Sequence, residues 1–123
     1  GYVAVVHGRP EDAAGEIDLP LIADWPNRPR QMVSHDRGRP ARTRWRVLRT
    51  EGEASRVELF PETGRSHQLR VHMAELGHPV LGDPLYGPAE GADAPRLMLH
   101  AERLAFRHPE GGAEMAFEVP SPF

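Results

Sequence analysis

Between residues 43 and 50 the sequence alternates arginine with apolar side chains, and this pattern constrains the fold more than any other. Alternation with a period of two predicts a β-strand, because successive side chains of a strand point to opposite faces of the sheet. Arginines then share one face of the strand, and Trp45 and Val47 share the other. The arginines of the predicted polar face are Arg42, Arg44 and Arg46.

A second strand is predicted at 55–60, where apolar residues again alternate with polar ones. The short segment Glu51-Gly52-Glu53 between the two runs favours a hairpin turn, so we expect the strands to pair antiparallel. Further strands are predicted at 2–7, near 16–19, at 31–34, at 97–107 and at 114–119. Loops are predicted over most of 9–31, which holds four prolines, and at 87–95.

One segment, 66–76, has the apolar spacing of a helix. Its apolar positions i, i+3, i+4 and i+7 are Leu69, His72, Met73 and Leu76. Ser66 is the expected N-cap and Gly77 the expected stop. The sum is an α+β fold: a mixed, mostly antiparallel sheet with one main helix.

The net charge of −3 argues against a nucleic-acid partner, but the distribution of charge argues for one. Residues 28–70 hold 11 arginines against 5 acidic residues, whereas both flanking segments are acidic. All 15 basic residues are arginine, the side chain best suited to bidentate phosphate contacts. The excess predicts either a surface that binds a polyanion or a solvated strand face.

Composition excludes several other classes. The chain has no cysteine, which excludes disulfides and thiolate metal sites. No apolar run reaches the roughly 20 residues of a membrane span, and no signal peptide is visible. His67 and His72 are five residues apart and cannot chelate one metal from a helix, so no metal is expected. Hydrogen-bonded structural roles are expected for the other histidines considered, namely His78, His100 and His108.

The segment 61–72, PETGRSHQLRVH, is the most informative for function. Its Thr63-Gly64 turn opens a helix, whose free N–H groups favour an anion. Arg70 lies at the edge of the apolar stripe, and a half-buried arginine needs an anionic partner. From the residues alone, that partner is either a carboxylate of this chain, such as Glu58 or Asp83, or an anion from outside it. The sequence Asp83-Pro84 is itself typical of a structural turn.

Several segments together resemble one family. The run PETGRSHQLRVHMAELGHPVLGDPLYG resembles the C-terminal motif of RluA-type RNA pseudouridine synthases. The flanking pieces YVAVVHG, GRPARTRWRVL, PRLMLHAERLAFRHP and EVPSPF resemble the same family in the same order. The resemblance spans the chain and implies the C-terminal half of a pseudouridine synthase catalytic fold, with residues 1–123 as that portion.

Such enzymes isomerise uridine to pseudouridine in ribosomal RNA, transfer RNA or both, and the resemblance implies no cofactor. The family nucleophile is an aspartate in an HRLD motif followed by TSG, which these 123 residues do not contain. His35-Asp36 lacks that context. Because the aspartate precedes the Y-x-A-x-V-x-G strand in the family, it is expected upstream of Gly1. The chain alone is then expected to be inactive, with the remaining half of its domain as a partner.

The resemblance implies roles for particular residues. Tyr2 matches the active-site tyrosine, which stacks on the flipped uracil and whose hydroxyl acts as an acid or base. Arg70 matches the arginine that pairs with the catalytic aspartate, which predicts that Arg70 has no good partner within this chain. Leu97 and Leu99 match the apolar strand that lines the substrate pocket. The candidate phosphate contacts are Arg42, Arg44 and Arg65.

Two other functions remain open: a non-catalytic RNA-binding module, and an unrelated β-rich hydrolase, for which no nucleophile–base pair is found. An HRLD motif upstream would favour the enzyme. RNA is the expected partner, a cytoplasmic location is expected, and no membrane is expected. Missing neighbour strands would leave an open sheet edge, which predicts possible self-association.

Overall fold

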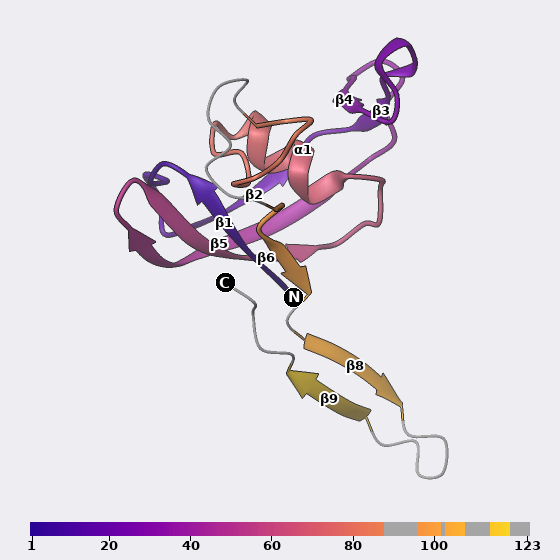
Figure 1. The fold of residues 1–123 in the computed structure, drawn as a ribbon. Coiled ribbons are helices and arrows are strands. Elements are labelled where there is room, and N and C mark those ends of the chain that lie inside the picture. The colour runs from indigo at the N-terminus through magenta and orange to yellow at the C-terminus, as the bar shows by residue number, and fades with distance from the viewer. Residues whose placement is uncertain (88–95, 102, 108–113, 119–123) are drawn as a thin grey trace.

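A computed structural model of the chain describes residues 1–87, 96–101, 103–107 and 114–118, the last two ranges as backbone only (Figure 1). The strands preceding the helix are β1 (Tyr2–His7), β2 (Ala14–Asp18), β3 (Leu21–Ala23), β4 (Gln31–Val33), β5 (Arg42–Glu51) and β6 (Ala54–Pro61). Helix α1 spans Gln68–Glu75, and β7 (Leu99–Ala101), β8 (Arg103–Arg107) and β9 (Glu114–Glu118) follow. A short 3-10 helix at Trp25–Asn27 separates β3 from β4.

Five strands form the main sheet in the order β2-β5-β6-β1-β7, with every neighbouring pair antiparallel. The predicted hairpin is confirmed: β5 and β6 pair from Thr43↔Pro61 to Glu51↔Ala54, around Gly52 at φ 65°. Two smaller antiparallel pairs are β3–β4 and β8–β9. The predicted α+β class, mostly antiparallel with one helix, is confirmed.

The core lies between α1 and one face of the sheet (Figure 1). Leu69 and Met73 of the helix pack with Trp45, Val57 and other buried sheet residues. Because side chains alternate along β5, Arg42, Arg44 and Arg46 lie on the face opposite Trp45, as predicted, and all three are exposed. Helix α1 packs on the face that carries Trp45, so Arg70 lies beside the core and not on the arginine-rich face.

Three local expectations are corrected. Helix α1 begins two residues later than predicted, and its N-cap is His67, in the left-handed conformation (φ 55°), not Ser66. The predicted strand 97–107 is two strands, since β7 pairs with β1 while β8 pairs with β9. Strand β3 lies in a segment predicted to be a loop. The predicted stop at Gly77 is confirmed, with φ 95° and its N–H donating to the Ala74 carbonyl at 3.0 Å.

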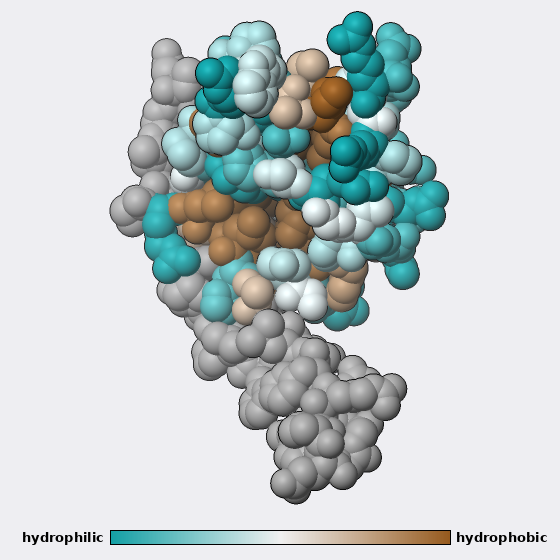
Figure 2. Space-filling model, turned by 90° about the vertical axis from the view of Figure 1, so that its right-hand side faces the viewer, coloured by the Kyte–Doolittle hydropathy of each residue, from teal (hydrophilic) through white to brown (hydrophobic). Residues whose placement is uncertain are grey.

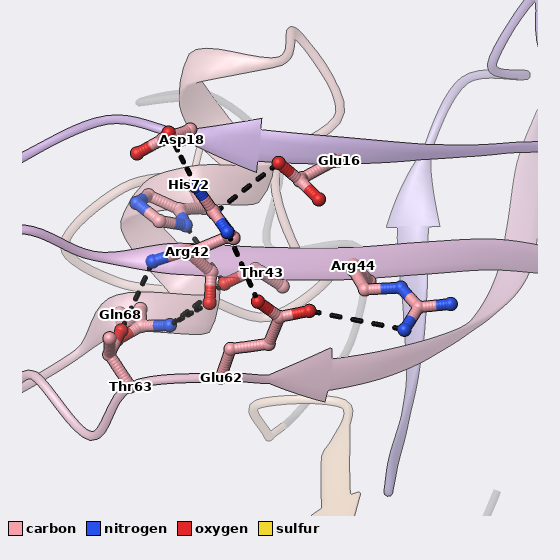
Figure 3. A network of polar contacts seen from close by, with 9 residues as sticks. All are labelled: Glu16, Asp18, Arg42, Thr43, Arg44, Glu62, Thr63, Gln68 and His72. Carbon is pink, nitrogen blue, oxygen red and sulfur yellow. Dashed lines mark hydrogen bonds and ion pairs between the residues drawn. The ribbon is translucent and has the colours of Figure 1, made fainter.

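A chain of hydrogen bonds fastens α1 to β5 (Figure 3). Gln68 Nε2 donates to Thr43 Oγ1 at 3.0 Å, and that hydroxyl bonds His72 Nδ1 at 2.9 Å. His72 Nε2 bonds the Leu19 carbonyl at 2.9 Å, which identifies Nε2 as the protonated nitrogen and Nδ1 as the acceptor. All three side chains are buried, so each bond forms away from competing water.

The hydrogen bonding predicted for the other histidines is found for His78 but not for His100. His78 Nδ1 bonds the His7 carbonyl at 2.8 Å, which confirms its structural role. The Nε2 atom of His100 is buried and has no hydrogen-bond partner among the described residues, contrary to expectation. His108 and the predicted loop residues 88–95 lie outside the described residues. No helix of the described part of the chain is long and apolar enough to cross a membrane.

The buried His72 predicts a pH-dependent stability. Burial lowers the pKa of folded His72 below the value of about 6.5 for an unfolded histidine, so the unfolded state binds more protons as pH falls. We expect the free energy of unfolding, measured with urea, to be largest above pH 6.5 and to decrease below it. His72→Asn should lose about 1–3 kcal/mol at neutral pH and show a shallower decrease. The exposed His35→Asn serves as control, and an unchanged slope in His72→Asn contradicts this account.

Candidate active site

A cavity of about 310 Å³ opens between the first residue of β1, the 61–67 loop and the first turn of α1. Four residues predicted from the sequence line it, namely Tyr2, Arg65, Arg70 and Leu99. The volume is at the small end of the range for ligand pockets, about 300–1,000 Å³. Figure 2, which shows the right-hand side of Figure 1, has hydrophobic side chains gathered between hydrophilic ones on this face.

Tyr2 and Leu99 come from neighbouring strands. Tyr2 pairs with Leu59 on one side and with Ala101 on the other, and Leu99 pairs with Ala4. Both are half-buried, so each has one side against the core and one toward the cavity. Leu97 packs against the same core but does not line the cavity, so the structure separates the two leucines.

Arg70 has a carboxylate partner within the chain, so the expectation that it is poorly satisfied is wrong. Its Nε donates to Asp83 Oδ2 at 2.9 Å, and its Nη2 donates to Asp83 Oδ1 at 2.8 Å. The side chains of Arg70 and Asp83 are 15% and 0% exposed. Of the two carboxylates proposed from the residues alone, Asp83 is the partner, while Glu58 bonds Arg46.

The turn that carries Asp83 explains the pair. Gly82 adopts φ 76°, and a Cβ there would stand 1.9 Å from the Arg96 carbonyl oxygen. Only glycine therefore fits where the turn packs against the backbone of Arg96. Asp83 Oδ1 also accepts the backbone N–H groups of Leu85 and Tyr86 at 2.9 and 3.1 Å. Its predicted role in a structural turn is thus confirmed, and the same carboxylate holds Arg70.

The charges of this pair reinforce each other. Burial alone would raise the pKa of Asp83, but the hydrogen bonds from Arg70 and from two backbone N–H groups outweigh it and lower that pKa. The hydrogen bond with Asp83 raises the pKa of Arg70. Both groups therefore stay charged at neutral pH, and a fixed positive charge stands at the cavity wall.

Tyr86 is a member of this site that no sequence pattern indicated. Its hydroxyl accepts the Gln31 backbone N–H at 2.8 Å and bonds His67 Nδ1 at 2.7 Å. Its ring centre lies 5.2 Å from the guanidinium carbon of Arg70 and 5.2 Å from that of Arg30. Tyr86 thereby joins the β3–β4 hairpin to the start of α1 and packs against Arg70.

His67 is held neutral in this setting. Burial, followed by the nearby charge of Arg70, lowers the pKa of His67. A neutral His67 with its proton on Nε2 accepts the Tyr86 hydroxyl proton at Nδ1, while the hydroxyl oxygen accepts the Gln31 N–H. Among the described residues, no group of three or more His, Cys, Asp or Glu side chains is placed to hold a metal.

Of the three arginines predicted to contact phosphate, Arg42 and Arg44 do not line the cavity. Figure 3 shows both of them beside carboxylates of this chain. Arg42 is within 3.3 Å of Glu16 and of Asp18 and 3.6 Å from Glu62. Arg44 is 3.9 Å from Glu62. The hydrogen bond with Asp18, followed by the charge of Glu16, raises the pKa of Arg42. Carboxylates of this chain therefore already neutralise Arg42, which weakens it as a phosphate contact, whereas Arg65 lies at the cavity.

The chain is similar to known proteins along its length. The sequence model of the family described as RNA pseudouridylate synthase matches residues 1–75. The dual-specificity RNA pseudouridine synthase RluA of Escherichia coli K12 is 54% identical over 99% of this chain and 57% of its own length. The RluA of Pasteurella multocida is 53% identical with the same coverage. The chain thus spans little more than half the length of these curated relatives.

Two solved structures resemble the fold. Human RNA pseudouridylate synthase domain containing 1 superposes with a TM-score of 0.82 at 32% identity, covering 99% of this chain and 54% of that one. Human RNA pseudouridylate synthase domain containing 4 gives a TM-score of 0.73 at 25% identity, covering 98% and 57%.

The buried pair predicts a large effect of a small substitution. Asp83→Asn removes the charge that compensates Arg70, so we expect a loss of about 3 kcal/mol in the free energy of unfolding by urea. Glu62→Gln is the matched control, because its pairs with Arg42 and Arg44 are exposed and should contribute less than about 1 kcal/mol. Equal losses for the two variants would contradict the assignment of Asp83 as the anchor of Arg70.

Proposed function

Because the chain belongs to the RNA pseudouridylate synthase family, we propose that residues 1–123 form the C-terminal, uridine-holding portion of the catalytic domain of an RNA pseudouridine synthase. The reaction detaches uracil from its ribose, turns the base and rejoins it through carbon. The observation that carries the proposal is the cavity that brings Tyr2, Arg70 and Leu99 together. The resemblance in sequence assigns catalytic roles to Tyr2 and Arg70 and the wall of the substrate pocket to Leu97 and Leu99.

Tyr2 is proposed to stack on the target uracil. Stacking of a base on an aromatic ring contributes roughly 1–3 kcal/mol, comparable to part of the few kcal/mol that flipping a nucleotide costs. Strand pairing on both sides of Tyr2 fixes the backbone that carries the ring, so little order has to be gained on binding. Leu99 supplies an apolar wall to the same cavity.

Arg70 is proposed to hold a second carboxylate, that of the nucleophilic aspartate. A guanidinium has five N–H donors, and the pair with Asp83 uses the edge formed by Nε and Nη2. The end of the guanidinium, with Nη1 and the remaining proton of Nη2, is left for another acceptor. A carboxylate there would stay ionised beside the positive charge, as a nucleophile requires. The expected role of Arg70 is therefore compatible with its pairing to Asp83.

The nucleophile itself is proposed to come from a segment outside these 123 residues, since they contain no HRLD motif. The proposed substrate is uridine in ribosomal RNA, transfer RNA or both, acted on in the cytoplasm and without a cofactor. A non-catalytic RNA-binding module is the second candidate, and the missing motif is what favours it. An HRLD sequence in the segment that precedes Gly1 decides for the enzyme.

The hydroxyl of Tyr2 is predicted to act in the chemistry. In the full-length protein, Tyr2→Phe should keep RNA affinity within about twofold, because the ring still stacks, but should lose tenfold or more in turnover, as expected for a lost acid or base. Fluorescence anisotropy measures the affinity, and tritium release from RNA labelled at carbon five of uridine measures turnover. Full turnover by Tyr2→Phe would reduce Tyr2 to a stacking platform.

The division of the domain is tested by complementation. Residues 1–123 alone should release no tritium from labelled RNA, because binding groups without a nucleophile do not cleave the glycosidic bond. Adding the segment with the HRLD aspartate in trans should restore release, and the same segment with that aspartate replaced by asparagine should not. Turnover by residues 1–123 alone would contradict the proposed origin of the nucleophile.

A further inference from the structure

A second cavity, of about 560 Å³, adjoins the first. Gly64 and Arg65 line both cavities, so the two adjoin each other on either side of the 61–67 loop. The other wall comes from β3, from Gln31 of β4 and from the segment that follows β4, which contributes Arg37 and Arg39. Three arginines from two separate loops thus line one hollow.

Among the residues that the structure describes, these arginines differ from those on β5 in having no carboxylate within ion-pair distance. Within the described ranges, neither Arg37 nor Arg39 forms an ion pair, although exposed Asp36 precedes Arg37. Arg65 Nε donates to the Pro40 carbonyl at 2.9 Å, a neutral acceptor that leaves its charge uncompensated. By contrast, three carboxylates surround Arg42. Like charges that converge without a counterion attract an external anion.

The backbone that carries the arginines is held in place. Arg39 and Leu21 exchange two backbone hydrogen bonds, of 2.8 and 3.0 Å. Gly38 donates to the Ser34 carbonyl at 2.8 Å and packs so closely that a Cβ would stand 2.3 Å from that oxygen. Gly38 is fixed against Ser34 and Pro20, so the backbone of its two arginine neighbours is held in place before binding. Less conformational entropy is therefore lost when a ligand binds.

We propose that the second cavity binds a backbone phosphate of the RNA strand, next to the nucleotide whose base occupies the first cavity. The inference rests on the proposed function for the identity of that nucleotide. The shared wall at Gly64 and Arg65 places the anion site directly beside the base site. Arginine forks match the oxygens of a phosphodiester, and a strand leaving the first cavity carries one charge at each linkage.

The test compares two pairs of arginines in the full-length protein. Affinity for a fluorescein-labelled uridine oligonucleotide is measured at several salt concentrations. Arg37→Gln with Arg39→Gln should reduce the slope of log affinity against log salt by about 0.7, the value for one phosphate of a single strand that is no longer neutralised. Arg42→Gln with Arg44→Gln is matched in charge and should leave the slope within about 0.3 of the unmodified protein, because internal carboxylates already compensate Arg42.

A second variant changes the position of the arginines without changing the charge of the protein. Gly38→Ala keeps every arginine but forces the loop away from Ser34, so it should also flatten the slope. Inorganic phosphate, titrated at constant ionic strength, should displace the oligonucleotide only in the millimolar range or above. Displacement at micromolar phosphate that depends on Arg37 and Arg39 would make this a free-phosphate site and overturn the proposal. Equal slopes for the two arginine pairs, or no binding of RNA by the unmodified protein, would overturn it as well.

Tritium release from carbon-five-labelled RNA, measured in parallel, keeps the two proposals apart. Release with unchanged salt slopes overturns the phosphate site and leaves the synthase function standing. No release, with a slope that depends on Arg37 and Arg39, supports the phosphate site as part of an RNA-binding module and overturns the synthase function.

Discussion

The buried hydrogen-bond chain through Gln68, Thr43 and His72 is the constraint on which the rest of the fold depends. Gln68 is its centre: the amide oxygen bonds the Thr63 hydroxyl at 2.6 Å and accepts the Arg65 N–H at 3.1 Å, while the amide nitrogen reaches β5 (Figure 3). One side chain thus sets the distance between the helix, strand β5 and the 61–67 loop. Since that loop separates the two cavities, their arrangement follows from the same contacts.

The arginines fall into two groups, those paired with a carboxylate of the chain and those without such a partner among the described residues. Asp83 compensates Arg70 in a buried pair that keeps its position fixed, whereas Glu16 and Asp18 of β2 and Glu62, which follows β6, surround Arg42 on the outer face. Arg37, Arg39 and Arg65 lack such partners among the described residues. A basic segment of this kind is therefore divided into arginines that serve the fold and arginines that remain available, and sequence position alone does not distinguish them.

The sequence predicted best those elements whose structure is determined by residues close to them in the chain. Alternation fixed the faces of β5, and Gly77 ended α1 because a left-handed residue is needed there. The N-cap was misassigned since Ser66 is the usual residue type, whereas tertiary bonds from Gln68 and Tyr86 decide the start of the helix.

The sequence predicted part of the candidate site. The roles expected for Tyr2, Arg70 and Leu99 follow from the resemblance in sequence, and the three residues meet in one cavity. The partner of Arg70 was left open, because thirteen positions and a turn at Gly82 separate it from Asp83. Tyr86 gave no signal at all: its hydrogen bonds join segments 55 and 19 positions away, and such contacts have no periodicity to read.

The sheet order also bears on how the chain reaches this state during synthesis. Strand β1 leaves the ribosome before the other strands of the main sheet, yet its neighbours are β6 and β7, and its residues from Val3 to Val6 are all buried in the finished sheet. A nascent β1 therefore lacks both of these sheet neighbours until the β5–β6 hairpin has emerged. The hairpin, whose contacts are local, forms the template onto which the older strand docks.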